Sequence, residues 1–264
     1  MWPVISRAFD KYQSDLRIME RCCRGLRFML RCVSQQICEI LQSLVGQIVR
    51  IYATYKHSCF LYVGSILVDE YATDPNCVQG LLDMLQAFIE PTFQLLQEEN
   101  GLRNHPDTVD DFFRLCARFM QRSPVPFLQC AALVHILQCS LMACTLDHKE
   151  ANTSVMKFFY DLVNTGKCGK NQADFEQRKV LVTSILNEYG QQLVTNLLHA
   201  CVFYLHSYML SEVADVFVEM LEFDREMTGK WLATGLDTLP KENNGGIMSA
   251  TPQQLNDIHA SMTR

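Results

Sequence analysis

Apolar residues recur at every third and fourth position along most of this chain, and this spacing constrains its fold more than any other feature. The runs 81–89 (LLDMLQAFI) and 112–120 (FFRLCARFM) are examples. This spacing places apolar side chains on one side of an α-helix, whereas a half-buried β-strand needs strict alternation, which no stretch of the chain sustains. The sequence therefore predicts an all-α protein.

Turn and capping residues divide the chain into helical segments of about 12 to 25 residues. Each break supplies a helix stop, or an N-cap with proline in the first turn of the next helix. The breaks fall at 73–75 (TDP), 100–101 (NG), 105–107 (HPD), 123–124 (SP), 166–169 (GKCG) and 239–240 (LP). The segments are long enough to pack against one another as pairs.

The second helix of each predicted pair begins near Asp15, His57, Asp107 and His148, at intervals of 42, 50 and 41 residues. A period of roughly 40 to 47 residues is typical of HEAT repeats, whose helix pairs must stack to bury their apolar faces. We therefore predict a HEAT-repeat α-solenoid, a right-handed superhelix of antiparallel helix pairs. It would form one segment over residues 1–264 with about five to six pairs, and a flexible loop near 241–251 would precede a short helix from Pro252.

Composition excludes several classes of function. The net charge of −6 disfavours general binding to nucleic acid or to an anionic membrane, because both need a dominant positive field. The twelve cysteines show no CxxC spacing, and most lie in apolar runs, such as Cys59, Cys116, Cys130 and Cys139. They are predicted to be small core residues in a reducing compartment. The longest apolar stretches fall short of the roughly 20 residues that a membrane span needs.

The most informative stretch is 14–33 (SDLRIMERCCRGLRFMLRCV), which carries five arginines at helical spacing. At about 100° per residue they share an arc of roughly 120° on one side of the helix, opposite an apolar side. They extend along about 21 Å of the helix axis, with Glu20 as the one acid among them. We call them the arginine stripe: Arg17, Arg21, Arg24, Arg27 and Arg31.

The arginine stripe has the chemistry of an oxyanion site. Every basic residue between Lys11 and Lys56 is arginine, whose planar fork matches the oxygens of phosphate or carboxylate. Alternate side chains of an extended peptide stand about 6.6 Å apart, so a peptide with phosphoserine at every second position matches the row. A nucleic-acid backbone is a weaker candidate for the ligand, because the protein is acidic overall. The alternative is that the arginine stripe binds no ligand and is an ordinary solvated helix face.

Other polar clusters have simpler interpretations. Asp107 is expected to cap the helix that follows Pro106, and Asp69-Glu70 to be a solvated helix end. Cys139, Cys144 and His148 have a loose metal-like spacing, but the sequence favours core positions for both cysteines, and no metal or other cofactor is predicted. The chain has neither a GxSxG elbow nor a phosphate-binding glycine loop, so no enzymatic activity is predicted.

Four stretches together resemble the transportin-SR group of the importin-β family. They are Asp15–Cys23, His57–Tyr62, Ser65–Tyr71 and Asn104–Asp111. Receptors of this group carry serine/arginine-rich splicing factors into the nucleus, and the likeness covers nearly the whole chain as the C-terminal portion of such a receptor. The resemblance implies that the arginine stripe binds phosphorylated serine/arginine-rich cargo on the concave surface of the superhelix, and that GTP-bound Ran releases the cargo.

The resemblance also implies contacts with nucleoporins and shuttling between cytoplasm and nucleus, with neither direct nucleic-acid binding nor a membrane partner. Asp110 and Asp111 are weaker candidates for the cargo site, where they would pair with cargo arginines. The alternative function is a helical-repeat scaffold for a phosphatase or another multiprotein complex, in which the arginine stripe is ordinary surface.

Overall fold

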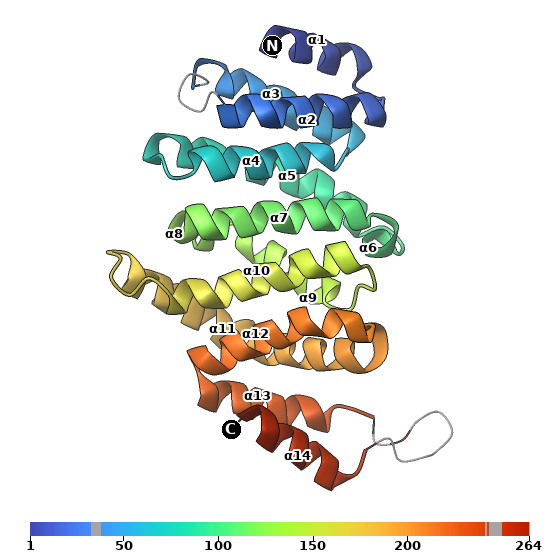
Figure 1. Cartoon of the computed structure of the whole chain (residues 1–264), viewed down its shortest axis with the longest axis vertical. Coiled ribbons are helices and arrows are strands. Elements are labelled where there is room, and N and C mark those ends of the chain that lie inside the picture. The colour runs from blue at the N-terminus through green and yellow to red at the C-terminus, as the bar shows by residue number, and fades with distance from the viewer. Residues whose placement is uncertain (33–37, 241, 243–249, 264) are drawn as a thin grey trace.

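The computed structural model describes residues 1–32, 38–240, 242 and 250–263, and these residues fold into a stack of helices (Figure 1). The predicted all-α solenoid is confirmed, since no β-strand occurs among the described residues. The first seven helices are α1 (Trp2–Tyr12), α2 (Leu16–Cys32), α3 (Cys38–Tyr55), α4 (Cys59–Tyr71), α5 (Pro75–Leu96), α6 (Gly101–Asn104) and α7 (Pro106–Arg122). The others are α8 (Pro124–Leu128), α9 (Leu133–Ala143), α10 (Lys149–Lys167), α11 (Phe175–His199), α12 (Leu210–Phe223), α13 (Arg225–Asp237) and α14 (Pro252–Thr263).

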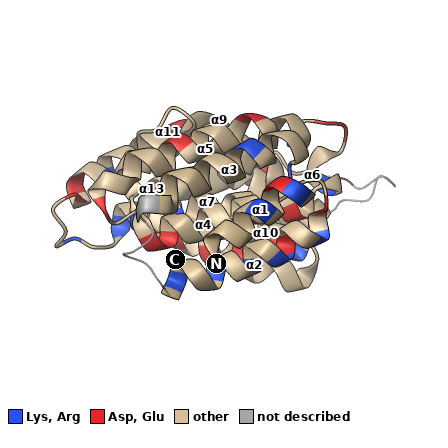
Figure 2. Cartoon of the chain, turned by 90° about the horizontal axis from the view of Figure 1, so that it is seen from above, with Lys and Arg blue, Asp and Glu red and all other residues tan. Residues whose placement is uncertain are grey.

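The helices form two rows that lie one behind the other (Figures 1 and 2). In the first row α2, α4, α7, α10 and α12 pack successively against one another, and we call it the α2–α12 row. In the second row α1 packs on α3, α3 on α5, α9 on α11 and α11 on α13. This arrangement agrees with helix pairing, because the α2–α12 row holds the helices expected near Asp15, His57, Asp107 and His148.

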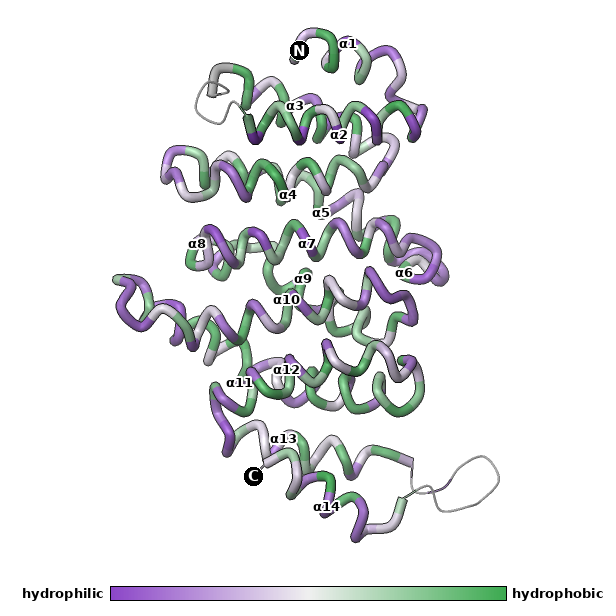
Figure 3. Tube along the Cα trace, in the orientation of Figure 1, coloured by the Kyte–Doolittle hydropathy of each residue, from purple (hydrophilic) through white to green (hydrophobic). Residues whose placement is uncertain are grey.

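A continuous apolar core separates the two rows. Aromatic rings follow one another along it: Phe112 contacts Phe113 at 5.4 Å between ring centroids, Phe113 contacts Phe158 at 5.6 Å, and Phe158 contacts Phe159 at 5.6 Å. All four side chains are buried. Because the Phe113–Phe158 contact joins α7 to α10, the core passes from one helix pair to the next, and Figure 3 shows hydrophobic and hydrophilic positions alternating along the helices of the stack.

The predicted breaks lie at the ends of helices. Asp74 caps α5, and its carboxylate accepts a hydrogen bond from the Asn76 backbone N–H at 2.9 Å. Prolines occupy the first turns of α5, α7 and α8, where the missing N–H costs nothing. Helix α10 ends at Lys167, and Gly169 follows with φ of +73°, a conformation that glycine adopts without strain.

The C-terminal part departs from the regular period. The α2–α12 row begins its helices at Leu16, Cys59, Pro106 and Lys149, but its next helix begins only at Leu210. Helix α11 is long and continues into a π-helical turn at Ala200–Tyr204. The final helix, α14, begins at Pro252 as predicted and packs on α13. The flexible loop predicted near 241–251 lies almost entirely outside the described residues.

None of the described helices combines the length and the apolar character that crossing a bilayer requires.

Candidate functional site

Helix α2 has an apolar side and a cationic side, as its sequence predicts. Met19, Cys23, Leu26 and Leu30 are buried against the neighbouring helices. The arginine stripe lies on the other side, where Arg17, Arg21, Arg24 and Arg31 are exposed and Arg27 is half-buried. Burial of the apolar side therefore fixes the direction in which the arginine stripe faces.

Three members of the arginine stripe have no protein partner. Within the described part of the chain, Arg17, Arg21 and Arg24 make neither an ion pair nor a side-chain hydrogen bond. Glu20 lies on the same helix and forms no ion pair with a described residue. The like charges stand one turn apart along α2 and repel one another at this spacing, so an anionic ligand would lower the electrostatic energy of this surface.

The other two members contact helix α4. The Arg27 guanidinium donates from Nη1 to the Tyr62 hydroxyl at 2.8 Å, while its Nε is buried and has no hydrogen-bond partner. Arg31 places Nε 3.8 Å from Oε1 of Glu70, and both side chains keep contact with solvent. The sequence interpretation of Asp69-Glu70 as a solvated helix end is wrong, because Glu70 faces Arg31 and Asp69 forms an ion pair with Arg122 of α7 at 2.7 Å.

A groove of about 530 Å³ crosses α2, α4 and the start of α7 beside the arginine stripe. The α2 side contributes two arginines and one glutamate, the α7 side contributes three aspartates, and α4 packs against both helices. From α2 and α7 the groove is lined by Glu20, Cys23, Arg24, Arg27, Phe28, Asp107, Asp110 and Asp111. From α4 and the residue before it, it is lined by Ser58, Cys59 and Tyr62. The fold therefore brings Arg24 and Arg27 to the same groove as Asp110 and Asp111, although 83 or more positions separate them in the sequence, whereas Arg17, Arg21 and Arg31 are not among the residues that line it.

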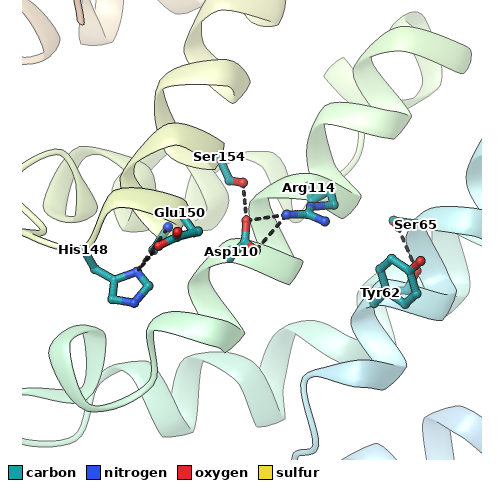
Figure 4. Close-up of polar contacts among 8 residues, drawn as sticks. Tyr62, Ser65, Asp110, Arg114, His148, Glu150 and Ser154 are labelled. Carbon is teal, nitrogen blue, oxygen red and sulfur yellow. Dashed lines mark hydrogen bonds and ion pairs between the residues drawn. The ribbon is translucent and has the colours of Figure 1, made fainter. Parts of the chain in front are cut away.

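Asp110 already has partners within the protein (Figure 4). Arg114, one turn along α7, donates to both of its carboxylate oxygens at 3.0 and 2.8 Å. The Ser154 hydroxyl of α10 also donates to Asp110. These contacts hold Asp110 at the α7–α10 contact, so its carboxylate shares its charge with Arg114 and is less available to a ligand than that of a free aspartate.

Asp107 and Asp111 differ from Asp110. Asp107 is exposed within the first turn of α7, and its predicted role as N-cap is wrong because His105 occupies that position. Its carboxylate still lies near the positive end of the α7 dipole. Burial raises the pKa of Asp111 to about 7, with further increases from Asp110 and Asp107, while a hydrogen bond from Ser58 and the charge of Arg114 act in the opposite direction.

The raised pKa of Asp111 predicts how Asp111→Asn changes stability. Near pH 8 the folded protein contains an ionised, half-buried carboxylate, and the amide removes that charge, so we expect a gain of about 1 to 2 kcal/mol, reduced from the full effect of the pKa shift by solvent screening. The folded protein takes up a proton as the pH falls through 7, whereas the unfolded chain does so only near pH 4. The stabilisation should therefore decrease between pH 8 and pH 5.

Thermal unfolding of both proteins at pH 8 and pH 5 measures this difference. Asp107→Asn, which changes an exposed carboxylate on the same helix, is the matched control and should show a smaller dependence on pH. An equal gain for Asp111→Asn at both pH values would contradict the prediction.

Some contacts of the site were missed by sequence reasoning. Tyr62 carries a hydroxyl inside the apolar run 59–68 (CFLYVGSILV), and this polar group in an apolar run is the sequence signal that could have identified it as part of the site.

Cys144 is buried as predicted and its thiol donates to the Ser140 carbonyl, while Cys139 is half-buried. His148 caps α10 by accepting from the Ala151 backbone N–H. Among the described residues, no group of three or more His, Cys, Asp or Glu has an arrangement that could hold a metal ion.

Comparison with known proteins locates the arginine stripe inside a matched domain. Residues 1–96 match the family model described as the Transportin-3/Importin-13 fourth TPR domain, and this range contains α2 and α4. The aspartates of α7 lie outside it. No name from this comparison describes a catalytic activity.

Curated proteins with similar sequences are much longer than this chain. Transportin MOS14 of Arabidopsis thaliana is 25% identical over 166 residues, which cover 63% of this chain and 17% of the relative. Importin-13 of Homo sapiens is 23% identical over 204 residues, which cover 75% of this chain and 21% of the relative. The chain thus spans about a fifth of the length of these relatives.

A solved structure described as importin-13 in its cytosolic state has a similar fold. It superposes with a TM-score of 0.82 and 16% sequence identity, covering 99% of this chain and 28% of that chain. At this identity the likeness establishes the fold, and it agrees with the helical solenoid described above.

Proposed function

We propose that this chain is the cargo-binding segment of a nuclear import receptor of the importin-β/transportin family, a proposal supported by its match at residues 1–96 and by its similarity to importin-13 and transportin MOS14. Its cargo is phosphorylated serine/arginine-rich protein. The arginine stripe binds the phosphates, and the α7 side of the groove, including Asp110 and Asp111, binds cargo arginines.

One observation carries this proposal: three exposed arginines that have no partner among the described residues lie in a row on α2, and the last of them, Arg24, lines a groove that also holds Asp107, Asp110 and Asp111. A phosphorylated serine/arginine segment alternates dianionic and cationic side chains, and both kinds of charge find a complement there. Arginine is suited to the phosphates because its planar donors pair with two oxygens at once. Asp111 suits a guanidinium because the cation favours the ionised carboxylate that burial disfavours.

In the full-length receptor, the rest of the proposed cycle follows the family. GTP-bound Ran releases the cargo in the nucleus, nucleoporins guide passage through the pore, and the receptor shuttles between cytoplasm and nucleus. The chain spans about a fifth of the length of its relatives, and these steps also need other parts of such a receptor. For the chain itself we propose cargo binding.

Titration with a matched pair of peptides tests the proposed function. The probes are a twelve-residue peptide of alternating phosphoserine and arginine and the same peptide with unmodified serine. Because several charge-assisted contacts depend on the phosphates, we expect phosphorylation to increase affinity by about 30-fold or more at low salt. The increase should shrink as ionic strength rises, since most of the contacts are exposed.

The outcome separates this function from the scaffold alternative. A scaffold whose arginine stripe is ordinary surface would bind both peptides equally or neither of them. Equal affinity for the two peptides, measured by calorimetry at 50 mM salt, would refute the import-receptor proposal.

A further inference from the structure

Arg27 and Arg31 of the arginine stripe both contact helix α4, but Arg27 alone of these two lines the groove, together with its partner Tyr62. Arg27 of α2 donates to the hydroxyl of Tyr62 of α4 at 2.8 Å, and both residues line the groove. Arg17, Arg21 and Arg24, by contrast, are exposed and have no partner among the described residues. Arg27 is thus the one member of the arginine stripe that a neighbouring helix holds in place beside the groove.

Arg27 and Tyr62 have hydrogen-bond donors without an acceptor among the described residues, as expected at a site for an anion. The Tyr62 oxygen accepts from Arg27, which leaves its own O–H proton to donate, and no described residue accepts it. On Arg27, the Nε donor is buried and has no acceptor. Because this Nε is buried, an oxygen atom that enters the groove would meet the Tyr62 hydroxyl, which lines the groove and has a proton to donate.

We propose that Tyr62 is a positioning residue that turns Arg27 into the phosphate-specific contact of the groove. In the bound state the Arg27 guanidinium and the Tyr62 hydroxyl donate to oxygens of one phosphate, and Arg24 completes the site from one turn away. This inference rests on the proposed function and adds the residue that increases the preference for a phosphorylated over an unphosphorylated segment. The other arginines of the stripe attract the phosphates of the cargo through their positive charge.

The test is the ratio of affinities for the phosphorylated and unphosphorylated twelve-residue peptides described above, measured with the 264-residue chain. Tyr62→Phe keeps the ring and the packing but removes the hydroxyl, so we expect the ratio to fall by about 5- to 20-fold, the effect of losing hydrogen bonds to a charged group. Affinity for the unphosphorylated peptide should remain unchanged. A loss of helix packing would lower both affinities together and leave the ratio intact.

Two matched controls sharpen the result. Tyr208→Phe removes a hydroxyl from an exposed tyrosine at a distant part of the stack and should leave the ratio unchanged. Arg27→Lys keeps the charge but removes the planar fork, so it should lower the ratio, whereas Arg7→Lys, at an exposed residue outside the arginine stripe and the groove lining, should not.

Failure of this inference is distinguishable from failure of the proposed function. If the wild-type protein binds both peptides equally, the proposed function is refuted, and with it the phosphate site. If the wild-type protein prefers the phosphorylated peptide but Tyr62→Phe and Arg27→Lys keep the full ratio, the assignment of Tyr62 and Arg27 is overturned while cargo binding stands.

Discussion

Replacement of Arg21, Arg24 and Arg27 by alanine is expected to lower affinity for the phosphoserine–arginine peptide by about 100-fold or more. Each exposed, charge-assisted contact contributes about 0.5 to 2 kcal/mol, and three such contacts are lost together. Helix content should remain unchanged, because Arg21 and Arg24 are exposed, Arg27 is half-buried and loses a hydrogen bond to Tyr62 rather than a core contact, and alanine is the best helix former. Calorimetry gives the affinity and circular dichroism the helix content.

The matched control removes three arginines elsewhere. Arg7, Arg50 and Arg103 lie outside the groove lining and are exposed, and their replacement by alanine changes the net charge by the same amount. For this control we expect a moderate, salt-sensitive loss of affinity for the phosphorylated peptide, because three positive charges that attract it are removed. If both triple variants lost affinity equally, the protein would act through its total charge, and the arginine stripe would have no special role.

The second large effect concerns stability and lies at the α11–α13 contact. Gly190 of α11 faces the Trp231 ring so closely that an added Cβ would stand 2.4 Å from the nearest ring carbon. The Trp231 side chain is 9% exposed and has little room to move. Gly190→Ala should therefore destabilise the fold by about 1 to 3 kcal/mol, and Trp231→Ala by about 3 to 5 kcal/mol through the cavity that it leaves.

Gly80→Ala is the matched control for this prediction. Gly80 is also inside a helix, but it is exposed and an added Cβ would meet nothing within 4 Å. Alanine should therefore stabilise α5 by about 0.5 to 1 kcal/mol through its better helix propensity. Urea unfolding of the three variants gives the comparison, and a stabilising effect of Gly190→Ala would show that α13 does not pack on α11 as described.

Each measurement has a different bearing on function. The triple arginine variant tests whether the stripe binds cargo, and the Tyr62→Phe variant tests how phosphate is recognised. The Gly190 and Trp231 variants test the end of the stack, which lies several helices away from the groove (Figure 1). Destabilisation there should leave peptide affinity unchanged at temperatures where the protein remains folded.

Much of the candidate site was predictable because it depends on local periodicity. The arginine stripe faces outward because Met19, Cys23, Leu26 and Leu30 occupy the opposite side of α2, and a helix that buries one side must expose the other. The start of α7 at Pro106 follows in the same way from proline in a first helical turn. Both features involve residues within a few turns of each other.

The rest of the site involves contacts between residues that are distant in sequence. Nothing in the local pattern indicates that Arg27 meets Tyr62, that Asp110 meets Ser154, or that Asp69 meets Arg122. The Asp69-Glu70 interpretation was wrong for this reason, because a charged pair at a helix end looks the same whether it faces water or the next helix. The raised pKa of Asp111 likewise depends on burial between helices.

The positions of most helices, and the side of each that is buried, follow from periodicity and capping within single segments of the sequence. Which charged residues of different helices lie together depends instead on how far each helix is shifted and rotated against the next when apolar side chains interlock. That packing places the basic side of α2 opposite the aspartates of α7 and makes one groove from two separate patterns.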